Sequence, residues 1–351
     1  MKIAMITPKF YPDIGGVEKH VLRVSEELIN RGYEITVITK KQNVSTLEVD
    51  KHNAVTLYRI PCTRIHEIWL WLFKNRDILK RADIIHCHDF GTFIFWYLPF
   101  RVLYPKKPVF ITFHGFEGII PIPRTIVALR KMAEKLTKGN ICIGDFIPKW
   151  YGTKPTMVLY GGVDLPKNLD QANTSKPDQK KMIYIGRLEE DTGVKEYISA
   201  LVILKSKYNL DIPGYICGDG SLRSTIQSEL TTHGLKHEML GFVQSPEEYL
   251  QNCQFAFVSG YLAILEAMAY RKMVLNISTN ALKNDYLRLI PNADAIMVTV
   301  DSPEELAERI AYYYNHPSTI DKFTVGARKF AEEHSWESVT DGYVRLWQSQ
   351  I

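Results

Sequence analysis

Cysteine is scarce in this chain, and a long apolar run is missing altogether. No CxxC pair is present, and the five cysteines stand apart at Cys62, Cys87, Cys142, Cys217 and Cys253. An odd, scattered set indicates reduced, mostly buried thiols of a cytosolic protein and not a disulfide framework. No apolar run approaches the roughly 20 residues that a membrane-spanning helix needs. The opening MKIAMITPKF reaches proline too early for a secretory signal peptide.

A strong excess of one charge is also missing. The net charge is +4 over 351 residues, which gives little support to nucleic-acid binding, so no nucleic-acid partner is expected. A mildly basic surface suits an anionic substrate or a membrane surface. The hydrophobic share of 46% and the charged share of 23% are those of a soluble globular protein. A chain of this length suits two domains better than one core.

Short β-type runs alternate with helical patterns along the whole chain, which indicates parallel sheets built from βα units. A polar stretch without periodicity, residues 167–181, is predicted to be a linker. The sequence therefore predicts an α/β protein with two Rossmann-like, doubly wound domains, residues 1–166 and 182–334. The last segment, residues 335–351, has a helical pattern and is expected to pack back on the N-terminal domain. The β runs of the second domain are MIYIG, GYICG, MLGFV, FAFVSG, MVLNIS and AIMVTV.

Ligands of open α/β sheets bind beyond the carboxyl ends of the strands, so the residues after each β run are the candidates. In the first domain, Gly15 and Gly16 stand directly before a helical pattern and would offer backbone amides at its positive end. A simple tight turn is the alternative. His86, His88 and His114 end two further runs, and each could equally be a hydrogen-bonded core histidine.

In the second domain the run MIYIG ends at Gly186-Arg187. The glycine lets a ligand approach the backbone, and the arginine carries a fixed fork of donors for phosphate. The alternative is an ordinary turn with a solvated arginine. Glu266 is expected to open a helix, where it could also be a plain first-turn acid. Further strand ends carry Gly218-Asp219-Gly220, in which Asp219 could cap a turn, and Gly241-Phe242-Val243.

With these residues in view, the chain resembles the GT-B fold glycosyltransferases, specifically the large retaining family 4 group. The resemblance covers nearly the whole chain, and its motifs stand in the order of that family. They are PDIGGVEKHV (12–21), HCH (86–88), FHG (113–115), GGVD (161–164), IGR (185–187), GDG (218–220), LGFV (240–243), LEAMA (265–269) and HSW (334–336).

The resemblance implies a role for each matching residue. Gly15 and Gly16 would lie near the donor phosphates and the reacting centre. Arg187 would bind the diphosphate and stabilise the leaving group, and His114 would lie near the transferred sugar. Further donor contacts would come from Glu266 on the ribose and from Val243, with Phe242, against the base. No cofactor beyond the nucleotide-diphosphate sugar and no metal is implied, and the acidic residues include no DxD pair.

Three donor-side positions depart from the pattern of the family. Thr192 stands where the family usually has a lysine, and Lys195, three residues on, is a candidate substitute. The first glutamate of the family's Glu-Gly-Phe-Gly loop is absent, because that loop is shortened to SGYL (259–262). The sequence STN (278–280) replaces an expected glycine pair.

The resulting prediction is a metal-independent, retaining glycosyltransferase that moves a sugar from a nucleotide-diphosphate sugar to a glycan or lipid-linked acceptor. The donor diphosphate would lie on the C-terminal domain and the acceptor mainly on the N-terminal domain. The departures motivate one alternative, a binding or scaffold relative without turnover. A GT-B nucleotide-sugar epimerase is the second alternative, although a convincing set of acid–base carboxylates is not found.

The N-terminal domain also carries two aromatic stretches near basic residues. IWLWLF (68–73) precedes Lys74, Arg76, Lys80 and Arg81, and FIFWYLPFRVLYPKK follows at 93–107. Aromatic side chains with lysine and arginine favour contact with an anionic membrane surface. We therefore expect a cytoplasmic protein with peripheral contact at the inner face of the membrane. The alternative is that these aromatics pack in the domain core.

Overall fold

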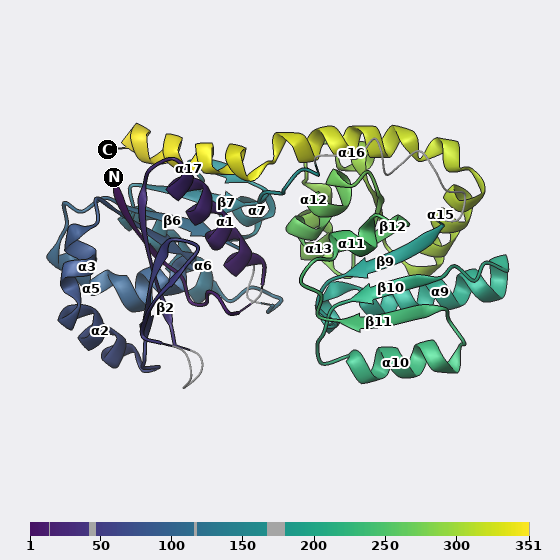
Figure 1. Cartoon of the computed structure of the whole chain (residues 1–351), viewed down its shortest axis with the longest axis horizontal. Coiled ribbons are helices and arrows are strands. Elements are labelled where there is room, and N and C mark those ends of the chain that lie inside the picture. Colours follow the sequence, from purple (N-terminus) through teal and green to yellow (C-terminus); the bar gives the residue numbers. More distant parts are fainter. Residues whose placement is uncertain (14, 42–46, 116–117, 167–179, 351) are drawn as a thin grey trace. The chain divides into compact units, whose positions relative to one another are not determined.

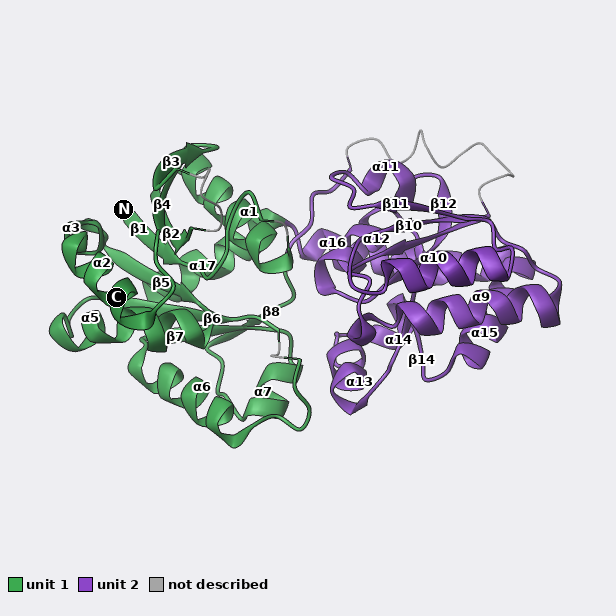
Figure 2. Ribbon diagram, turned by 90° about the horizontal axis from the view of Figure 1, so that it is seen from below, with its two compact units in different colours: residues 1–161, 336–351 green, residues 162–335 purple. Residues whose placement is uncertain are grey.

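The computed structural model describes residues 1–13, 15–41, 47–115, 118–166 and 180–350 (Figure 1). They form two compact units, coloured separately in Figure 2. Unit 1 comprises residues 1–161 and 336–351, and unit 2 comprises residues 162–335. Each unit is built on its own, mainly parallel sheet, which confirms the predicted α/β class.

The boundary between the units lies earlier than the sequence suggested. Residues 162–166 were expected in the N-terminal domain but belong to unit 2. Val163 is held there, because its N–H donates to the His334 carbonyl at 3.0 Å and it forms a parallel bridge with Ser335. Of the predicted linker, residues 167–179 lie outside the described residues, and Lys181 already opens a strand.

The sheet of unit 1 has the order β3-β4-β2-β1-β5-β6-β7-β8. All neighbours are parallel except β3 and β4, and the short edge strand β3 was not predicted. The central strands β1, β5 and β6 are buried along almost their whole length, because helices cover both faces of a parallel sheet. The strands are β1 (Lys2–Ile6), β2 (Glu34–Lys40), β3 (Val49–His52), β4 (Val55–Ile60), β5 (Ile84–His88), β6 (Val109–Phe113), β7 (Gly139–Ile143) and β8 (Met157–Leu159).

Helix α1 begins at the predicted glycine pair and buries Val21, Val24 and Leu28 on one face, as its 3.6-residue period requires. The C-terminal helix α17 belongs to unit 1 and contacts α1, β7 and β8. The helices of unit 1 are α1 (Gly16–Asn30), α2 (Ile65–Lys74), α3 (Arg76–Arg81), α4 (Asp89–Gly91), η1 (Thr92–Tyr97), α5 (Leu98–Leu103), α6 (Arg124–Leu136), α7 (Phe146–Tyr151) and α17 (Trp336–Gln350).

The sheet of unit 2 has the order β11-β10-β9-β12-β13-β14 and is parallel throughout its described pairs. Its last strand is shorter than predicted, since the first residues of the run AIMVTV are helical in α14. The strands are β9 (Lys181–Ile185), β10 (Gly214–Cys217), β11 (His237–Gly241), β12 (Cys253–Val258), β13 (Met273–Ile277) and β14 (Val298–Val300).

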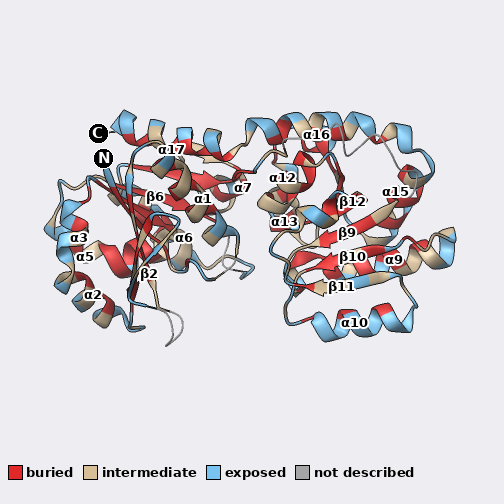
Figure 3. Ribbon diagram, in the orientation of Figure 1, coloured by how far each residue is buried: buried red, intermediate tan, exposed pale blue. Residues whose placement is uncertain are grey.

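One core cluster of unit 2 joins these strands with the buried faces of α9, α10 and α15 (Figure 3). The rings of Tyr184, Tyr197 and Phe257 contact one another within it. The prediction that Glu266 opens a helix is wrong: β12 ends at Val258, and α12 already begins at Tyr261 with Gly260 as its N-cap residue. The helices of unit 2 are η2 (Glu190–Thr192), α9 (Val194–Tyr208), α10 (Arg223–Thr232), α11 (Glu247–Leu250), α12 (Tyr261–Ala269), α13 (Ala281–Arg288), α14 (Ala293–Ile296), α15 (Pro303–Asn315), η3 (Pro317–Thr319) and α16 (Asp321–Glu333).

Across the described part of the chain, no helix is both long enough and apolar enough to cross a membrane.

Candidate active-site residues

In unit 1 the predicted glycines form the start of α1. Gly15 is the N-cap residue with an extended backbone, and Gly16 is the first helical residue. A Cβ added to Gly16 would meet nothing within 4 Å, whereas one on Gly15 would stand 2.3 Å from the Glu18 carboxylate. The helix start is therefore open at Gly16 and covered by its own first-turn acid at Gly15.

His114 lies directly after β6 at the same edge of the sheet and is only 8% exposed. Its Nε2 is 3.0 Å from Nδ1 of His88, the last residue of the neighbouring strand β5. Its backbone N–H donates to the Asp89 carboxylate at 2.8 Å. The ring of His20, one turn into α1, lies 5.1 Å from that of His114 between centroids. The fold thus brings the glycine helix and the strand-end histidines together.

The hydrogen bonds fix which nitrogen of each ring carries the proton. His88 Nε2 is buried without a partner. A buried N–H without an acceptor is costly, so His88 keeps its proton on Nδ1 and donates it to His114. His114 Nε2 is then the acceptor, and its Nδ1 carries the proton. Burial lowers the pKa of both rings well below the ordinary value, so His114 is a neutral hydrogen-bond donor.

Helix α17 closes this histidine cluster from one side. The Trp347 indole N–H donates to Nδ1 of His86 at 3.1 Å, and His86 Nε2 therefore donates to Thr112 at 2.8 Å. The Tyr343 hydroxyl lies 2.9 Å from both Thr112 and His20 Nε2. Burial lowers the pKa of His20 to about 4. His86, predicted with a structural alternative, acts here as a link between β5 and α17.

Two residues near His114 were not identified from the sequence. Asp89, which anchors the His114 backbone, adopts a positive φ of 67°, an unusual conformation for a residue other than glycine. Arg130, on α6, is 1% exposed and donates to the Gly115 carbonyl at 3.1 Å. Its guanidinium lies 4.0 Å from the ring centroid of Tyr151. Neither residue belongs to a motif, and only the fold brings them to the strand ends.

In unit 2, three glycines bring the ends of β9, β10 and β11 close together. The Gly186 N–H donates to the Cys217 carbonyl at 3.1 Å, and the Gly218 N–H donates to the Gly241 carbonyl at 2.7 Å. A Cβ on Gly218 would overlap the Gly186 carbonyl oxygen, at 1.8 Å. No side chain fits there, so the three loops present closely spaced backbone at the carboxyl edge of the sheet.

Arg187 follows the first of these glycines and is 67% exposed. Its guanidinium bonds both oxygens of Asp191, at 2.9 and 3.2 Å, as an exposed pair one turn away. The Tyr184 hydroxyl bonds the Arg187 carbonyl at 2.7 Å and the Thr192 hydroxyl at 3.0 Å. Thr192 is thus a buried, neutral part of the scaffold that holds the arginine turn.

The other predicted donor residues are spread over three elements of unit 2. Lys195, the second residue of α9, is partly exposed and pairs with Glu190 at 2.5 Å, not with the Asp191 that pairs with Arg187. Val243 follows β11 and is partly exposed beside the exposed Phe242. Glu266 is the sixth residue of α12, about 7 Å along the helix axis from its first residue.

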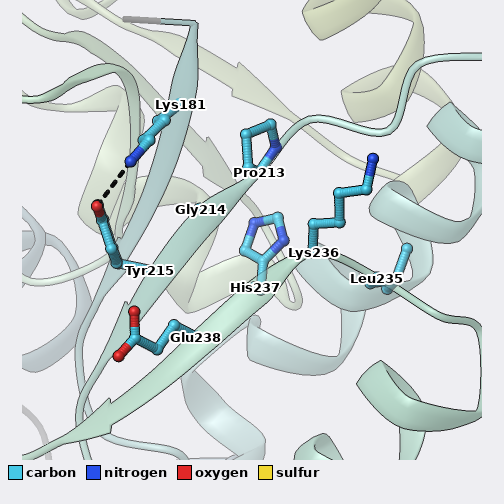
Figure 4. A pocket seen from close by; sticks show the side chains of 8 residues that line it. All are labelled: Lys181, Pro213, Gly214, Tyr215, Leu235, Lys236, His237 and Glu238. Atoms are coloured by element: carbon cyan, nitrogen blue, oxygen red, sulfur yellow. Dashed lines mark hydrogen bonds between the residues drawn. The ribbon is translucent and has the colours of Figure 1, made fainter.

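A shallow pocket of unit 2 lies elsewhere (Figure 4). Its lining includes Lys181, Gly214 and His237, the first residues of β9, β10 and β11. It therefore opens at the amino ends of the strands, opposite the edge where ligands of such sheets bind. Among the described residues, no group of three or more His, Cys, Asp or Glu side chains is arranged to hold a metal ion.

Comparison with known families agrees with this arrangement. Residues 14–166 match the family described as Glycosyltransferase Family 4, and residues 167–330 match Glycosyl transferases group 1. The chain is a GT-B glycosyltransferase of the family 4 type. The matches together span nearly the whole sequence, and the predicted family and enzyme class are confirmed.

Several relatives and solved structures of other proteins are similar to this chain over nearly its full length. An uncharacterised glycosyltransferase of Methanocaldococcus jannaschii is 22% identical over 99% of this chain and 98% of its own. A GDP-mannose:cellobiosyl-diphosphopolyprenol alpha-mannosyltransferase of Xanthomonas oryzae is 21% identical over 98% and 96%. The structure of Anabaena HepE in complex with UDP aligns with a TM-score of 0.77 at 15% identity, over 99% of this chain and all of that one. Sucrose-phosphate synthase of Thermosynechococcus elongatus gives 0.78 at 15% identity, over 99% and 98%. The predicted GT-B fold is thus confirmed.

Proposed function

We propose that this glycosyltransferase is a retaining enzyme that takes its sugar from a nucleotide-diphosphate sugar. The observation that carries the proposal is Arg187 at the glycine-lined strand ends of unit 2. A guanidinium in a turn whose glycines leave room for a ligand can bind the oxygens of a diphosphate. Val243 and Glu266 are proposed for the base and the ribose, and Lys195 for a further phosphate contact. We expect no cofactor and no metal, because cationic side chains and backbone amides can neutralise the leaving diphosphate.

The proposed reaction takes place on one face of the sugar. The bond from the anomeric carbon to the donor phosphate breaks while a bond to the acceptor hydroxyl oxygen forms on the same face. The acceptor proton passes to an oxygen of the departing phosphate. Arg187 stabilises the negative charge that develops on the leaving group, and fixed donors of this kind supply several kcal/mol.

Unit 1 is proposed as the acceptor side. Gly15 and Gly16, at the start of α1, stay proposed for the donor phosphates near the reacting centre. His114 lies at the same edge of the sheet, and burial holds its ring neutral. A neutral ring donates a hydrogen bond to a sugar hydroxyl without needing a charged partner. This matches a role beside the transferred sugar, where no phosphate charge has to be balanced.

The test is a thermal-shift screen with UDP, GDP and their sugars, because one relative is named for GDP-mannose and HepE was solved with UDP. A ligand at 100 times its dissociation constant adds about 2.7 kcal/mol of stability. A positive nucleotide sugar is then assayed for transfer to a diphosphopolyprenol-linked glycan and to soluble sugars. Absence of a shift with every nucleotide and nucleotide sugar would contradict the proposal.

We further propose a lipid-linked acceptor and peripheral contact with the inner, cytoplasmic face of a membrane. In unit 1, α2 buries Ile68 and Leu72 but leaves Leu70 59% exposed. Nearby, Val102 on α5 is 71% exposed, and the Trp69 indole donates to the Phe95 carbonyl of η1. The aromatic runs are thus partly core and partly surface. Basic residues on and after α2 are exposed: Lys74, Arg76, Lys80 and Arg81.

Co-sedimentation with anionic liposomes at low salt tests the membrane contact. Replacing Lys74, Arg76, Lys80 and Arg81 with glutamine removes about 1 kcal/mol of surface attraction per charge. The matched control replaces four exposed lysines of unit 2, namely Lys207, Lys236, Lys322 and Lys329. We expect the first variant, and not the second, to stay in the supernatant. If both variants sediment equally with the liposomes, the basic residues of α2 and α3 do not bind the membrane.

A further inference from the structure

Lys283 is a buried cation at the same edge of the unit 2 sheet as Arg187. It is the third residue of α13, and its backbone N–H is capped by the Asn280 side chain at 2.9 Å. Its side chain is buried, with a relative exposure of 9%, and Nζ donates to the Ser259 carbonyl at 2.5 Å. Ser259 directly follows β12, so the ammonium lies at the carboxyl end of a central strand.

Within the part of the chain that the structure describes, no carboxylate pairs with this ammonium. Among the described residues, the contacts of Nζ are the Ser259 carbonyl and the face of Tyr286, whose ring centroid is 4.4 Å away. An ammonium has three N–H donors, so two have no acceptor in this structure. Taking a charge out of water without a partner is costly, and burial lowers the pKa of Lys283 to about 8. A buried, unpaired cation of this kind is matched to an anion from outside the protein.

The fold places Lys283 next to the arginine turn. Gly193, which opens α9 after that turn, packs so closely on the end of β13 that a Cβ would stand 2.6 Å from Ile277. α13 starts from that same strand end. The charges of Asp191 and Arg187 both act on Lys283, the first raising and the second lowering its pKa. Thr192, which follows Asp191 in the chain, adds no charge to this group.

We propose that Lys283 is a second cation for the diphosphate of the nucleotide sugar and works together with Arg187. The inference rests on the proposed function above and names a residue of its donor site. A diphosphate carries more than one negative charge, and the two unused N–H donors of Lys283 can bind its oxygens. The lysine is held in place through Tyr286, which stacks on Tyr261 with 4.0 Å between ring centroids and accepts the Tyr261 backbone N–H.

Nucleotide binding should then depend on pH. The charged or titratable groups that face Lys283 are Arg187, Asp191 and the stacked Tyr286 and Tyr261. The pKa of Tyr286 is raised by burial, so it stays neutral. A bound diphosphate favours the charged ammonium and raises the Lys283 pKa. Affinity is therefore highest below about pH 8 and falls as the pH rises through that value.

Calorimetric titration of UDP and GDP tests the proposal on the wild type and three variants. Lys283→Met should weaken binding of whichever nucleotide binds by about tenfold or more, as should Arg187→Ala. The matched control is Lys272→Met. Lys272 is also buried, donates to the Gln251 carbonyl and has its pKa lowered to about 8, but it precedes β13 at the opposite edge of the sheet. Binding should be unchanged in this control.

A measurement on the wild type alone does not depend on the folding of any variant. Its affinity should fall by about threefold between roughly pH 7.5 and 8.5, a range above the ionisation of the phosphates and below that of the uracil and guanine rings. Wild-type affinity in Lys283→Met together with loss in Arg187→Ala overturns the role of Lys283 and leaves the donor site in place. A pH-independent wild-type affinity also overturns it. Failure of the wild type to bind either nucleotide overturns the donor assignment and this inference with it.

Discussion

Both sheets are mainly parallel, but the residues at their carboxyl ends differ in chemistry. In unit 1 they are lined by neutral histidines, which α17 and the neighbouring strands bury and of which His114 keeps 8% exposure. In unit 2 they carry an exposed arginine, a buried lysine and backbone brought close by glycine. Burial accounts for the difference, because it removes the charge of a histidine near neutral pH but not that of an arginine. One edge is therefore suited to uncharged hydroxyls and the other to an anion.

Among the variants that test this contrast, Arg187→Ala has the largest expected effect. The variant should lose about 3 kcal/mol of transition-state stabilisation, roughly a hundredfold in kcat/KM, with the unfolding midpoint unchanged. The side chain is exposed, so its removal leaves no cavity. Steady-state kinetics and urea unfolding give the two numbers. The control is Arg309→Ala on α15, an exposed arginine paired one turn away with Glu305. Equal activity in both variants would contradict a phosphate role for Arg187.

Acid should destabilise unit 1 through its histidines. Burial lowers the pKa of His20 to about 4 and of His86 to about 3, whereas a histidine in the unfolded chain titrates near 6.5. The unfolded chain binds protons first as the pH falls, so this stability is fully present above about pH 6.5 and is lost below it. Each of the two should cost about 2 kcal/mol between pH 7 and 5.

Tryptophan fluorescence can follow unit 1 by itself. All six tryptophans lie in its segments, at Trp69, Trp71, Trp96, Trp150, Trp336 and Trp347. Urea unfolding at pH 7 and pH 5 therefore measures the loss directly. His20→Gln keeps an amide near the Tyr343 hydroxyl but cannot titrate, so it should show a smaller loss. The same loss in both proteins would mean that His20 does not contribute to the acid sensitivity.

Tyr343→Phe should destabilise unit 1 by about 1–2 kcal/mol, since His20 and Thr112 both lose a buried partner. The same fluorescence measurement gives the value. Tyr313→Phe on α15 of unit 2 is the control, and it should leave the unit 1 transition unchanged. A neutral effect of Tyr343→Phe would show that the hydroxyl does not help to hold α17 on the sheet.

His114→Ala has the smallest expected effect and sharpens the contrast most. Removing one neutral hydrogen bond to the sugar should lower kcat/KM by about tenfold, equivalent to about 1.4 kcal/mol. The dissociation constant for UDP or GDP should not change, because the ring carries no charge to share with the diphosphate. Kinetics and calorimetry on the same preparation separate the two. Weaker binding of the free nucleotide would place His114 on the phosphates instead.

The sequence predicted most strands of both sheets, because continuous apolar runs mark strands that are buried on both faces. It missed β3, a polar edge strand with no such pattern. Two helix and strand bounds were also predicted wrongly. The predicted last strand included two residues of α14, since a short apolar run suits a helix and a strand equally. The start of α12 was placed at Glu266, five residues too late. Gly16, Arg187 and His114 were correctly expected near the carboxyl ends of strands, because parallel topology fixes where such residues gather; their roles stay predictions.

Lys283, Asp89 and Arg130 could not be found in this way. Each is an ordinary residue of a helix or turn in the sequence, and its environment comes from segments far away in the chain. The pKa of Lys283 and the hydrogen bonds of Asp89 and Arg130 depend on burial and on neighbouring groups. These are properties of the packed structure and not of the local sequence.

The sequence by itself therefore determined the fold, the two sheets and the positions after each strand, because hydrophobic periodicity and glycine placement are local. Only the tertiary structure decided which of those side chains are charged. It buries four histidines and, among the described residues, leaves Lys283 without a carboxylate partner while the charge of Arg187 acts on it. Desolvation depends on every segment that packs around a group, and no local pattern contains that information.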